Sequence, residues 1–433
     1  MEPSRPYSFR MAAATVGPPQ VLHLSLVVGG ALRDSAGERL GRVDDLIVRL
    51  GDPGYPPITG FLVTVAGRQA YMPAERVAEI EHGVVTLRVP TLDLARFERR
   101  PEEVLLKEDV LDRQLINVDG ARLVRANEIE LARLEGWFRV VGVDTGLRGW
   151  LRRLAPRALS DSVGAGRFLD WASVEPFTGH VPTVRLRVPH PKLARLHPAE
   201  LADLVEAASH REGEEIIQAV GADPELEADV FEELESHHQL EFLEDRSDEE
   251  VAQVLMRMEA DDAADLVAEL PEERREQILE LLPDVQRRRV RALLGHDPAT
   301  AGGLMSPEFI CVYSQATLPE VFERIRGSHA SAEAIASIYV MNTRRRLHGA
   351  ITLADLLRAS EGQRVGEIAG VAQRLRPDAD LEEVARLMTD YDLTVVPVVD
   401  EEDRLLGVIT VDDVLELVLP KNWRRRFGVM GEE

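Results

Sequence analysis

The sequence contains one cysteine, few aromatic residues and no long apolar run. The single thiol, Cys311, excludes an internal disulfide and is typical of a protein from the reducing cytosol. An aromatic content of 5% within a hydrophobic content of 45% is typical of a globular chain rich in helices. Because no segment approaches the roughly 18–20 apolar residues that cross a bilayer, we expect no membrane span and a cytoplasmic location.

Several motifs that carry chemistry are also missing. The sequence has no Gly-x-Ser-x-Gly elbow, no His-Glu-x-x-His pattern, no phosphate-binding P-loop and no cysteine pair for zinc. The pair His237-His238 has no obvious third ligand, and we expect it to face solvent. Residues 1–19 lack the compact apolar core of a secretion signal and are interpreted as a flexible tail. We therefore predict a protein that is not an enzyme.

The acidic residues are distributed unevenly. The chain has a formal net charge of −25, and residues 199–297 alone hold 30 acidic and 9 basic residues. A field of this sign repels nucleic acid and anionic membranes and attracts cations, so no nucleic-acid partner is expected. The alternative is that these carboxylates only solvate a helix surface.

Residues 20–95 and 96–185 each contain short alternating strands separated by turns. Residues 34–46 form one charged hairpin pattern, and residues 110–125 repeat it around the tight turn Asp119-Gly120. Both runs resemble PRC-barrel modules, which are generally docking modules. The resemblance implies two small β-barrels with a partner surface; the alternative is a pair of structural barrels without a site. A connector follows, over residues 160–195.

Residues 196–298 contain an α-helical pattern. Ser247 and Glu250 form a capping box, and proline stands at several first helical positions, where its missing N–H is harmless. Short helices that follow one another closely bury their apolar faces by stacking, so the pattern predicts an α-solenoid. The six helix starts lie at Pro198, Pro224, Ser247, Asp261, Pro271 and Pro283.

Residues 299–360 and 361–420 are two similar units, each with a strand, a turn, a strand and a helix. Both contain the pattern Gly-x-x-Thr-x-x-Asp, at Gly349 to Asp355 and at Gly407 to Asp413. This is the signature of the CBS repeat. The whole chain is therefore predicted to have a multidomain α/β fold: two barrel modules, an α-solenoid and a tandem CBS pair of α+β type.

Residues 196–420, including the junction Ala301-Gly302-Gly303-Leu304-Met305, resemble the cytosolic half of the MgtE magnesium channel family. In that family a membrane pore follows the second CBS repeat. Here the chain ends with a basic segment, residues 421–433, which contains Trp423. The resemblance implies a sensor without its pore, acting on a separate membrane transporter. The basic segment is expected to contact a membrane protein or lipid headgroups, or to be an ordinary charged chain end.

The candidate metal ligands are carboxylates, the hard oxygen donors that Mg²⁺ prefers. Asp261 and Asp265 are spaced i, i+4 on one predicted helix face, with Asp262 beside them. The resemblance implies that Asp261 and Asp265 face Asp392, Asp413 and Glu416 of the second CBS repeat across a magnesium-binding interface. For each acid, a helix cap or a solvated side chain is the alternative. The full set of candidates is Asp261, Asp262, Asp265, Asp390, Asp392, Asp412, Asp413 and Glu416.

The candidate nucleotide ligands are Thr352 with Asp355 and Thr410 with Asp413. In CBS repeats these positions contact the phosphate and ribose of adenine nucleotides, which implies ATP or AMP as a ligand. Ala354 stands where the family often has arginine, and this weakens the expected phosphate contact. Asp413 is claimed by both sites. Without a ligand, the same residues would be helix caps.

These features together predict a magnesium-responsive regulatory protein that dimerises through its CBS repeats. Mg²⁺ is expected to close the acidic helical region onto the CBS pair, and its loss is expected to let them separate. The protein would act on a divalent-metal membrane transporter, with the barrels or the basic tail as its docking surface. The alternatives are an adenine-nucleotide energy sensor and a docking scaffold without a ligand.

Overall fold

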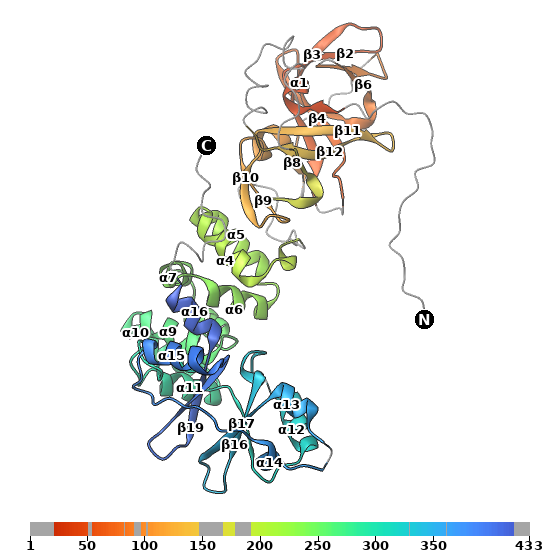
Figure 1. The fold of residues 1–433 in the computed structure, drawn as a ribbon. Helices are drawn as coiled ribbons and strands as arrows, with labels where there is room; N and C mark the ends of the chain where they lie inside the picture. The colour runs from red at the N-terminus through yellow and green to blue at the C-terminus, as the bar shows by residue number, and fades with distance from the viewer. Residues whose placement is uncertain are drawn as a thin grey trace. The chain divides into compact units, whose positions relative to one another are not determined.

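A computed structural model of the chain describes residues 21–50, 54–81, 83–90, 97–100, 103–146, 168–177, 192–328, 330–360 and 362–419. It divides into two compact units, Met1–Ala219 and Val220–Glu433 (Figure 1). The predicted tails, residues 1–19 and 421–433, lie outside the described residues, as does most of the predicted connector. In the parts of the chain that are described, every helix is too short or too polar to span a bilayer.

The first unit begins with β-sheets and continues into helices α4 (Pro198–Ala207) and α5 (His210–Val220). One short helix, α1 (Leu24–Val27), precedes most of the strands. The strands are β1 (Leu22–His23), β2 (Ala31–Arg33), β3 (Arg39–Arg49), β4 (Ile58–Val65), β5 (Arg68–Pro73), β6 (Val77–Glu81), β7 (Val84–Leu87), β8 (Glu103–Leu105), β9 (Gln114–Asn117), β10 (Arg122–Arg125), β11 (Glu128–Leu134), β12 (Trp137–Asp144), β13 (Phe168–Asp170) and β14 (Val174–Pro176).

Both predicted hairpins are present as antiparallel pairs. Strand β2 pairs with β3, and β9 pairs with β10 across the turn that contains Asp119 and Gly120. The short strands β13 and β14 lie within the predicted connector and pair with β12 and β9. The connector prediction is therefore wrong for these residues, which complete two sheets.

The two predicted modules exchange strands. Strand β1 pairs with β11, and β8 pairs with β3, so each region supplies a strand to the sheet of the other. The buried carboxylate of Asp45 accepts hydrogen bonds from the backbone N–H groups of Lys107 and Glu108, at 2.8 and 3.1 Å. Among the described residues the strand order of every sheet is open, and no sheet closes on itself. Two closed barrels are thus not confirmed, and one buried cluster connects both regions.

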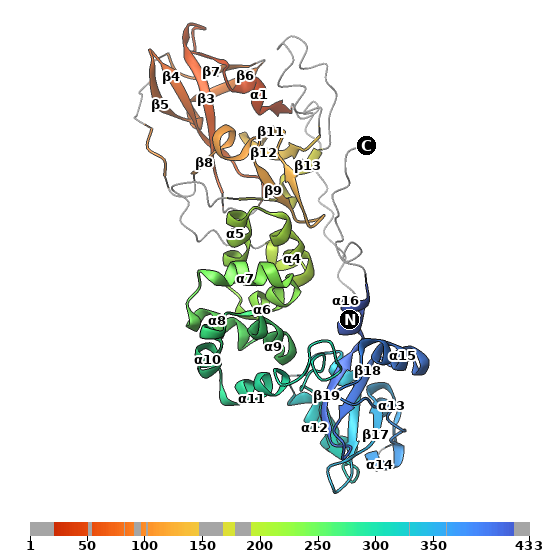
Figure 2. The same cartoon turned by 90° about the vertical axis from the view of Figure 1, so that its left-hand side faces the viewer.

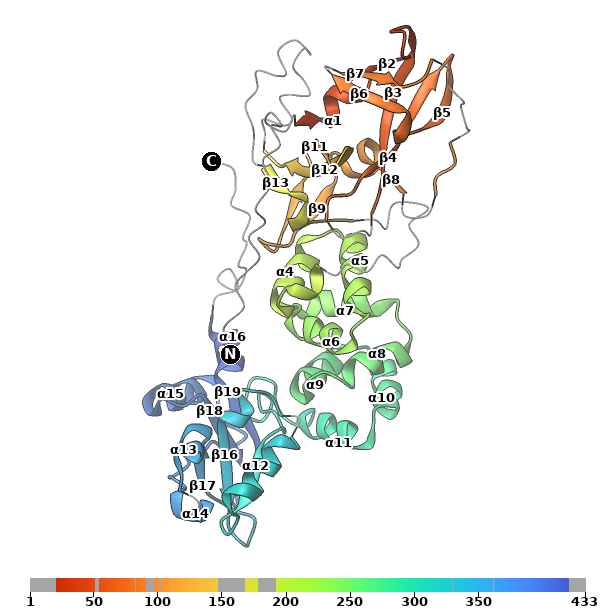
Figure 3. The ribbon, with the colours of Figure 1, turned by 90° about the vertical axis from the view of Figure 1, so that its right-hand side faces the viewer.

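The second unit begins with short helices that pack in two rows. Helix α6 contacts α8 and α8 contacts α10, while α7 contacts α9 and α9 contacts α11 (Figures 2 and 3). Ser247 and Glu250 form the predicted capping box of α8. This alternate packing buries the apolar faces, as the sequence indicates; a regular solenoid stays a prediction. The helices are α6 (Pro224–Glu233), α7 (Ser236–Glu244), α8 (Asp248–Leu255), α9 (Ala260–Glu269), α10 (Glu272–Leu281) and α11 (Asp284–Leu293).

The remainder of the second unit contains the two predicted repeats. The first has the sheet β15-β16-β17 and the second has the pair β18-β19. The repeats are joined by hydrogen bonds between Ala350 and Gly370 and from the N–H of Leu347 to the carbonyl of Asp403. The elements are β15 (Ile310–Tyr313), α12 (Leu318–Arg326), β16 (Ser337–Met341), β17 (Leu347–Thr352), α13 (Leu353–Arg358), α14 (Val365–Ile368), α15 (Leu381–Tyr391), β18 (Val395–Val399), β19 (Leu405–Thr410) and α16 (Val411–Val418).

The junction between α11 and the repeats is fixed to the second repeat. The N–H groups of Ala301 and Gly302 donate to the carbonyls of Ala379 and Pro377, each at 2.8 Å. Ser306 and Val408 exchange two backbone hydrogen bonds, at 2.8 and 2.9 Å. The junction therefore runs beside β19, the strand that leads into α16.

Candidate metal centre

Helix α9 carries its carboxylates in its first turns, and helices α6 and α11 hold the first residues of this helix in place by hydrogen bonds. Glu232 of α6 accepts a hydrogen bond from the N–H of Glu259, at 2.6 Å, and Gln286 of α11 donates to the carbonyl of Met258, at 3.2 Å. Asp261 and Asp262 follow in the first turn, where the unpaired N–H groups of a helix favour negative charge. Asp265 lies one turn further along the same face.

Helix α16 has a second acidic start. Strand β19 ends at Thr410, which caps the helix, and the carboxylate of Asp413 accepts hydrogen bonds from the N–H of Thr410, at 3.2 Å, and from its hydroxyl group. Asp412 is exposed beside it, and Glu416 lies one turn further along. Each helix therefore carries carboxylates in its first two turns.

The carboxylates of α9 and α16 face one another. Burial, and then the charge of Asp413, raises the pKa of Asp261 well above its ordinary value. Burial and the charges of Asp261, Glu232 and Asp413 do the same to the pKa of Asp262. Charges of the same sign thus oppose one another across the two helices.

Asp265 and Glu416 lie one helical turn beyond Asp261 and Asp413 on their respective helices. Burial, with the charges of Glu269 and Glu416, raises the pKa of Asp265 to about 6. Burial, together with Asp412 and Glu416, also raises the pKa of Asp413 to about 6, against the hydrogen bonds from Thr410. The charge of Asp413 thus acts on Asp261, and the charge of Glu416 acts on Asp265.

The arrangement fits a hydrated divalent cation. Oδ1 of Asp261 is buried and has no hydrogen-bond partner within the described residues. A buried acceptor without a partner is unfavourable, and a cation relieves it. In the described ranges no three His, Cys, Asp or Glu side chains lie close enough together to hold one ion directly. Mg²⁺ keeps several of its waters in proteins, so one or two carboxylates and bridging waters can complete its shell.

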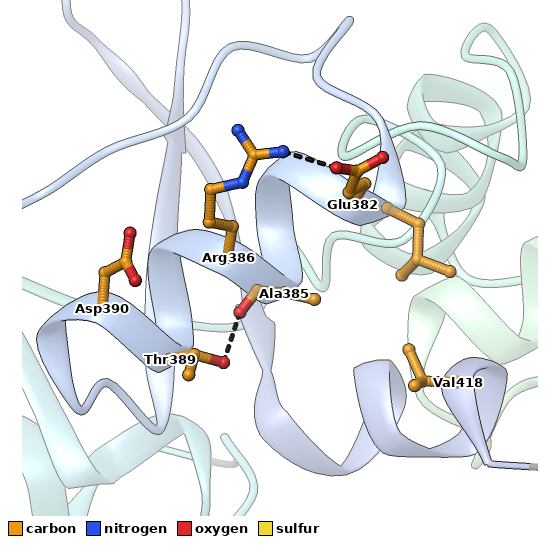
Figure 4. A pocket seen from close by; sticks show the side chains of 7 residues that line it. Glu382, Ala385, Arg386, Thr389, Asp390 and Val418 are labelled. Atoms are coloured by element: carbon orange, nitrogen blue, oxygen red, sulfur yellow. Dashed lines mark hydrogen bonds and ion pairs between the residues drawn. The ribbon is translucent and has the colours of Figure 1, made fainter.

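Two predicted metal ligands lie elsewhere on the second repeat. Asp390 lines a pocket of about 510 Å³ along α15, beside the ion pair of Arg386 with Glu382 (Figure 4). Asp392 is exposed and ends α15 in a left-handed conformation, with φ of 53°. Among the described residues no hydrogen bond or ion pair joins either of them to α9 or to Asp413. The remaining six candidates are linked only by the electrostatic influence of their charges between α9 and α16: Asp261, Asp262, Asp265, Asp412, Asp413 and Glu416.

The predicted nucleotide ligands form two equivalent pairs. Thr352 caps α13, where its hydroxyl accepts from the N–H of Asp355, at 3.1 Å, and contacts the Asp355 carboxylate, at 2.8 Å. Thr410 and Asp413 make the same kind of pair at α16. Asp355 is also 3.6 Å from Arg358. Without a ligand, each pair satisfies itself as a helix cap, the alternative that the sequence left open.

Four further carboxylates belong to the acidic interface and are not apparent from the sequence: Glu232, Glu259, Glu308 and Glu333. Burial, and then the charges of Asp413, Glu308, Asp412 and Glu333, raises the pKa of Glu259 to about 7. Burial and the charge of Glu259 raise the pKa of Glu232 to about 7. These residues come from separate segments of the second unit, so no sequence spacing could have predicted that they belong to one site.

The histidine pair that the sequence analysis expects to face solvent lies on α7. His237 is exposed as predicted, and His238 is half-buried with its ring 6.3 Å from that of Phe242.

Comparisons with known proteins match two parts of the chain, the acidic helical region and the CBS repeats. The family model of the MgtE intracellular N domain matches residues 196–299, and the CBS domain model matches residues 301–362 and 373–420. The magnesium transporter MgtE of Thermus thermophilus is 45% identical over 144 residues, which cover 33% of this chain and 32% of that protein. The magnesium transporter MgtE of Bacillus subtilis is 30% identical over 193 residues, covering 44% and 43%. The chain thus matches less than half the length of these relatives.

A solved structure is similar over the same region. The cytosolic domain of the Mg²⁺ channel MgtE in complex with ATP is 35% identical, with a TM-score of 0.51. The similarity covers 54% of this chain and 95% of that one. The resemblance of residues 196–420 to the cytosolic region of MgtE is therefore confirmed.

Proposed function

We propose that the second unit is a magnesium sensor that regulates a membrane transporter for a divalent metal. The observation that carries the proposal is the pair of acidic helix faces, Asp261 and Asp265 on α9 opposite Asp413 and Glu416 on α16. The similarity to a cytosolic domain of a Mg²⁺ channel supports Mg²⁺ as the cation and the cytosolic side of the membrane as the location. Asp262 and Asp412 add further oxygen donors beside these pairs.

The sensing follows from electrostatics. Without a cation, the carboxylates of α9 and α16 repel one another across a partly dry interface, where charges interact more strongly than in water. A divalent cation between them reverses the sign of the interaction and favours the closed arrangement. A ligand shifts such an equilibrium only by its difference in affinity for the two states. A site that responds to millimolar Mg²⁺ needs about −4 kcal/mol of binding free energy.

The test is a titration of the full chain with MgCl₂, followed by limited proteolysis and thermal melting. We expect a saturable gain in stability of the second unit, and protection of α9 and α16 from protease. Asp261→Ala and Asp413→Ala should remove the gain, and CaCl₂ in a parallel titration measures selectivity. A melting curve that does not change with either cation would overturn the proposal.

Adenine-nucleotide binding is the second candidate. Two observations favour it: the similar solved structure is a complex with ATP, and the Thr-Asp pairs occupy equivalent helix starts in both repeats of this chain. ATP or AMP would then be the physiological ligand and the acidic faces would be solvated. Stabilisation by nucleotide in a chelator, lost in Thr352→Val, would support this reading; no response to nucleotide would reject it.

The proposed sensor acts as a homodimer of CBS repeats on a separately encoded transporter. Exposed apolar side chains on α16 support a dimer, because Leu415, Leu417 and Val418 are 46%, 49% and 54% exposed. The strand-rich first unit, with its resemblance to docking modules, is the proposed contact to the transporter. Sedimentation of the full chain tests the dimer. Photo-crosslinking from the first unit in cells should capture a divalent-metal transporter, and crosslinks to soluble proteins alone would contradict the partner.

A further inference from the structure

Arg289 of helix α11 forms an ion pair outside the helical region, whereas two neighbouring arginines of this helix pair within it. Arg287 pairs with Glu280 and Asp284, and Arg291 pairs with Glu276 and Glu280, so both stay within the helical region. Arg289 instead pairs with Glu308, which lies beyond the junction, in the first CBS segment. The pair is partly protected from solvent, with 37% of the arginine side chain and 20% of the glutamate side chain exposed.

Glu308 is held by the CBS region. It follows Ser306, which exchanges two backbone hydrogen bonds with Val408 of β19. The N–H of Glu308 also donates to the hydroxyl of Ser306, at 3.4 Å. Glu308 therefore lies two residues beyond the point where the chain pairs with β19 (Leu405–Thr410), the strand that leads directly into α16 and Asp413. The Arg289 ion pair connects the helical region to this segment beside β19.

The preceding turn of α11 also holds the start of α9 in place. Gln286, one turn before Arg289, donates to the carbonyl of Met258, next to Glu259. Glu259 lies in the electrostatic field of both Glu308 and Asp413. Arg289 thus places a permanent positive charge beside Glu308, in an interface that otherwise gathers carboxylates from five segments.

We propose that Arg289 is a built-in counter-charge of the acidic interface. Its ion pair with Glu308 holds the helical region against the CBS region without metal and lowers the Mg²⁺ concentration at which the interface closes. This inference rests on the proposed function, because it assigns a residue that sets the threshold of the same sensor. Arg289 is a positioning residue and not a metal ligand: its guanidinium is cationic and has no lone pair to donate.

The physical reason is the balance of charges at the interface. With Arg289 in place, the charge of Glu308 is neutralised and the cation must overcome repulsion among fewer carboxylates. Without it, Glu308 adds to the repulsion on Glu259. A partly exposed ion pair has a modest effect, so removal should raise the Mg²⁺ midpoint about two- to five-fold. Charge reversal should have a larger effect than removal.

The test compares Arg289→Gln, Glu308→Gln, Arg289→Glu and the exchanged pair Arg289→Glu/Glu308→Arg in the full chain. Arg291→Gln is the matched control, because Arg291 lies on the same helix but pairs only within the helical region. The first readout is the Mg²⁺ midpoint of protease protection. The second is a distance distribution in chelator, from spin labels on cysteines placed at the exposed positions Gln277 and Glu402, with Cys311→Ser.

Arg289→Gln and Arg289→Glu should raise the midpoint and lengthen the distance in chelator. Glu308→Gln removes a repelling carboxylate together with the ion pair, so it should raise the midpoint less than Arg289→Gln does. The exchanged pair should restore both quantities, and Arg291→Gln should change neither. The proposal is overturned if Arg289→Gln behaves like Arg291→Gln, or if the exchanged pair behaves like Arg289→Glu. The two hypotheses fail differently. A wild-type chain that does not respond to Mg²⁺ rejects the magnesium sensor, while the metal-free distance still shows whether Arg289 holds the interface. If Arg289→Glu does not fold, Arg289→Gln and the exchanged pair give the same decision.

Discussion

Asp261 is a carboxylate whose surroundings oppose its charge. Burial and the charges of Asp413, Glu259 and Asp265 all favour its neutral form, and one of its oxygens has no partner among the described residues. Asp261→Asn should therefore stabilise the metal-free second unit, because an amide has no charge to desolvate. We expect a gain of at least about 1 kcal/mol, or about 2–4 °C in melting temperature in a chelator.

The same substitution should abolish stabilisation by Mg²⁺. Asp390→Asn is the matched control, since Asp390 is exposed on α15 in the same unit. It should leave both the metal-free melting temperature and the Mg²⁺ response unchanged. A loss of stability in metal-free Asp261→Asn would show that the carboxylate is compensated by a group that the described residues do not reveal.

Metal-free stability should depend on pH in a defined direction. Carboxyl groups titrate near pH 4 in an unfolded chain, whereas the pKa values of Glu232 and Glu259 are raised to about 7 and those of Asp265 and Asp413 to about 6. The folded state therefore binds protons more tightly than the unfolded state. Stability from these groups is present below pH 4 and is lost as pH rises through about 6 to 7.

Melting of the second unit in chelator, measured from pH 5 to pH 8, checks this dependence. The melting temperature should fall across the range, and saturating Mg²⁺ at pH 8 should restore most of the loss. Asp45 of the first unit also has a pKa raised to about 6 by burial, so pH should affect that unit as well. Mg²⁺ should not change the melting temperature of the first unit. A melting temperature of the second unit that rises with pH would contradict the facing carboxylates.

Sequence patterns identified the members of this site that are close along the chain. The spacing of Asp261 and Asp265 predicts one helix face, and Thr410 and Asp413 predict a helix start. Glu232 and Glu259 are 27 positions apart and meet only because α6 packs near the start of α9. Contacts of this kind depend on tertiary packing, and local periodicity carries no information about them.

At the scale of the element, the junction after α11 has two glycines that the fold requires. A Cβ atom on Gly303 would lie 2.5 Å from the carbonyl oxygen of Asp297 and 2.6 Å from Cα of Pro298. Both are backbone atoms and cannot rotate away, so Gly303→Ala should destabilise the second unit by about 1–3 kcal/mol. Gly295→Ala is the control, because its nearest neighbour, the carbonyl oxygen of Ala292, is 3.4 Å away.

Thermal or urea unfolding of the two variants measures the difference. Because the junction connects α11 to β19, Gly303→Ala should also loosen the coupling between the helices and the CBS region. Faster hydrogen exchange at Ala301, Gly302 and Ser306 would show this. Equal stability of Gly303→Ala and Gly295→Ala would mean that the junction can shift without breaking its hydrogen bonds to the second repeat.

Helix starts show where local signals suffice. Prolines and the Ser247 capping box predict α4, α6, α8, α10 and α11, although Pro271 and Pro283 occupy the capping position and not the first helical one. Helix α5 was missed although Ser209 and Glu212 form hydrogen bonds at its start, a pattern visible in the sequence. Helix α7 lacks a side-chain cap and has no comparable signal; its packing against α9 stabilises it.

At the scale of the whole molecule, a metal response should be confined to one unit. The facing carboxylates all lie within Val220–Glu433. Hydrogen exchange of the full chain with and without Mg²⁺ should therefore show slower exchange over α9, α16 and the junction, and no change in β1 to β14. If Mg²⁺ slowed hydrogen exchange in the sheets as much as in α9 and α16, the result would contradict a local sensor. It would indicate that the cation acts through the first unit.

The sheets of the first unit could be predicted only in part. The alternation of residues 58–65 and the turn at Asp119-Gly120 predict β4 and the β9–β10 hairpin, both of which are present. The assignment of strands to two separate modules failed because β1 and β8 pair across the predicted boundary. Alternation determines which face of a strand is buried, but it does not determine the partner strand.

Exchange of β1 has a consequence for biosynthesis. Leu22 pairs with Leu131, so strand β1 leaves the ribosome more than a hundred residues before its partner strand exists. At about 5–20 residues per second, this interval lasts several seconds. Throughout it, Leu22 and Leu24, which are buried in the finished unit, stay uncovered. We therefore expect a chaperone that binds apolar segments to recognise the nascent segment around β1.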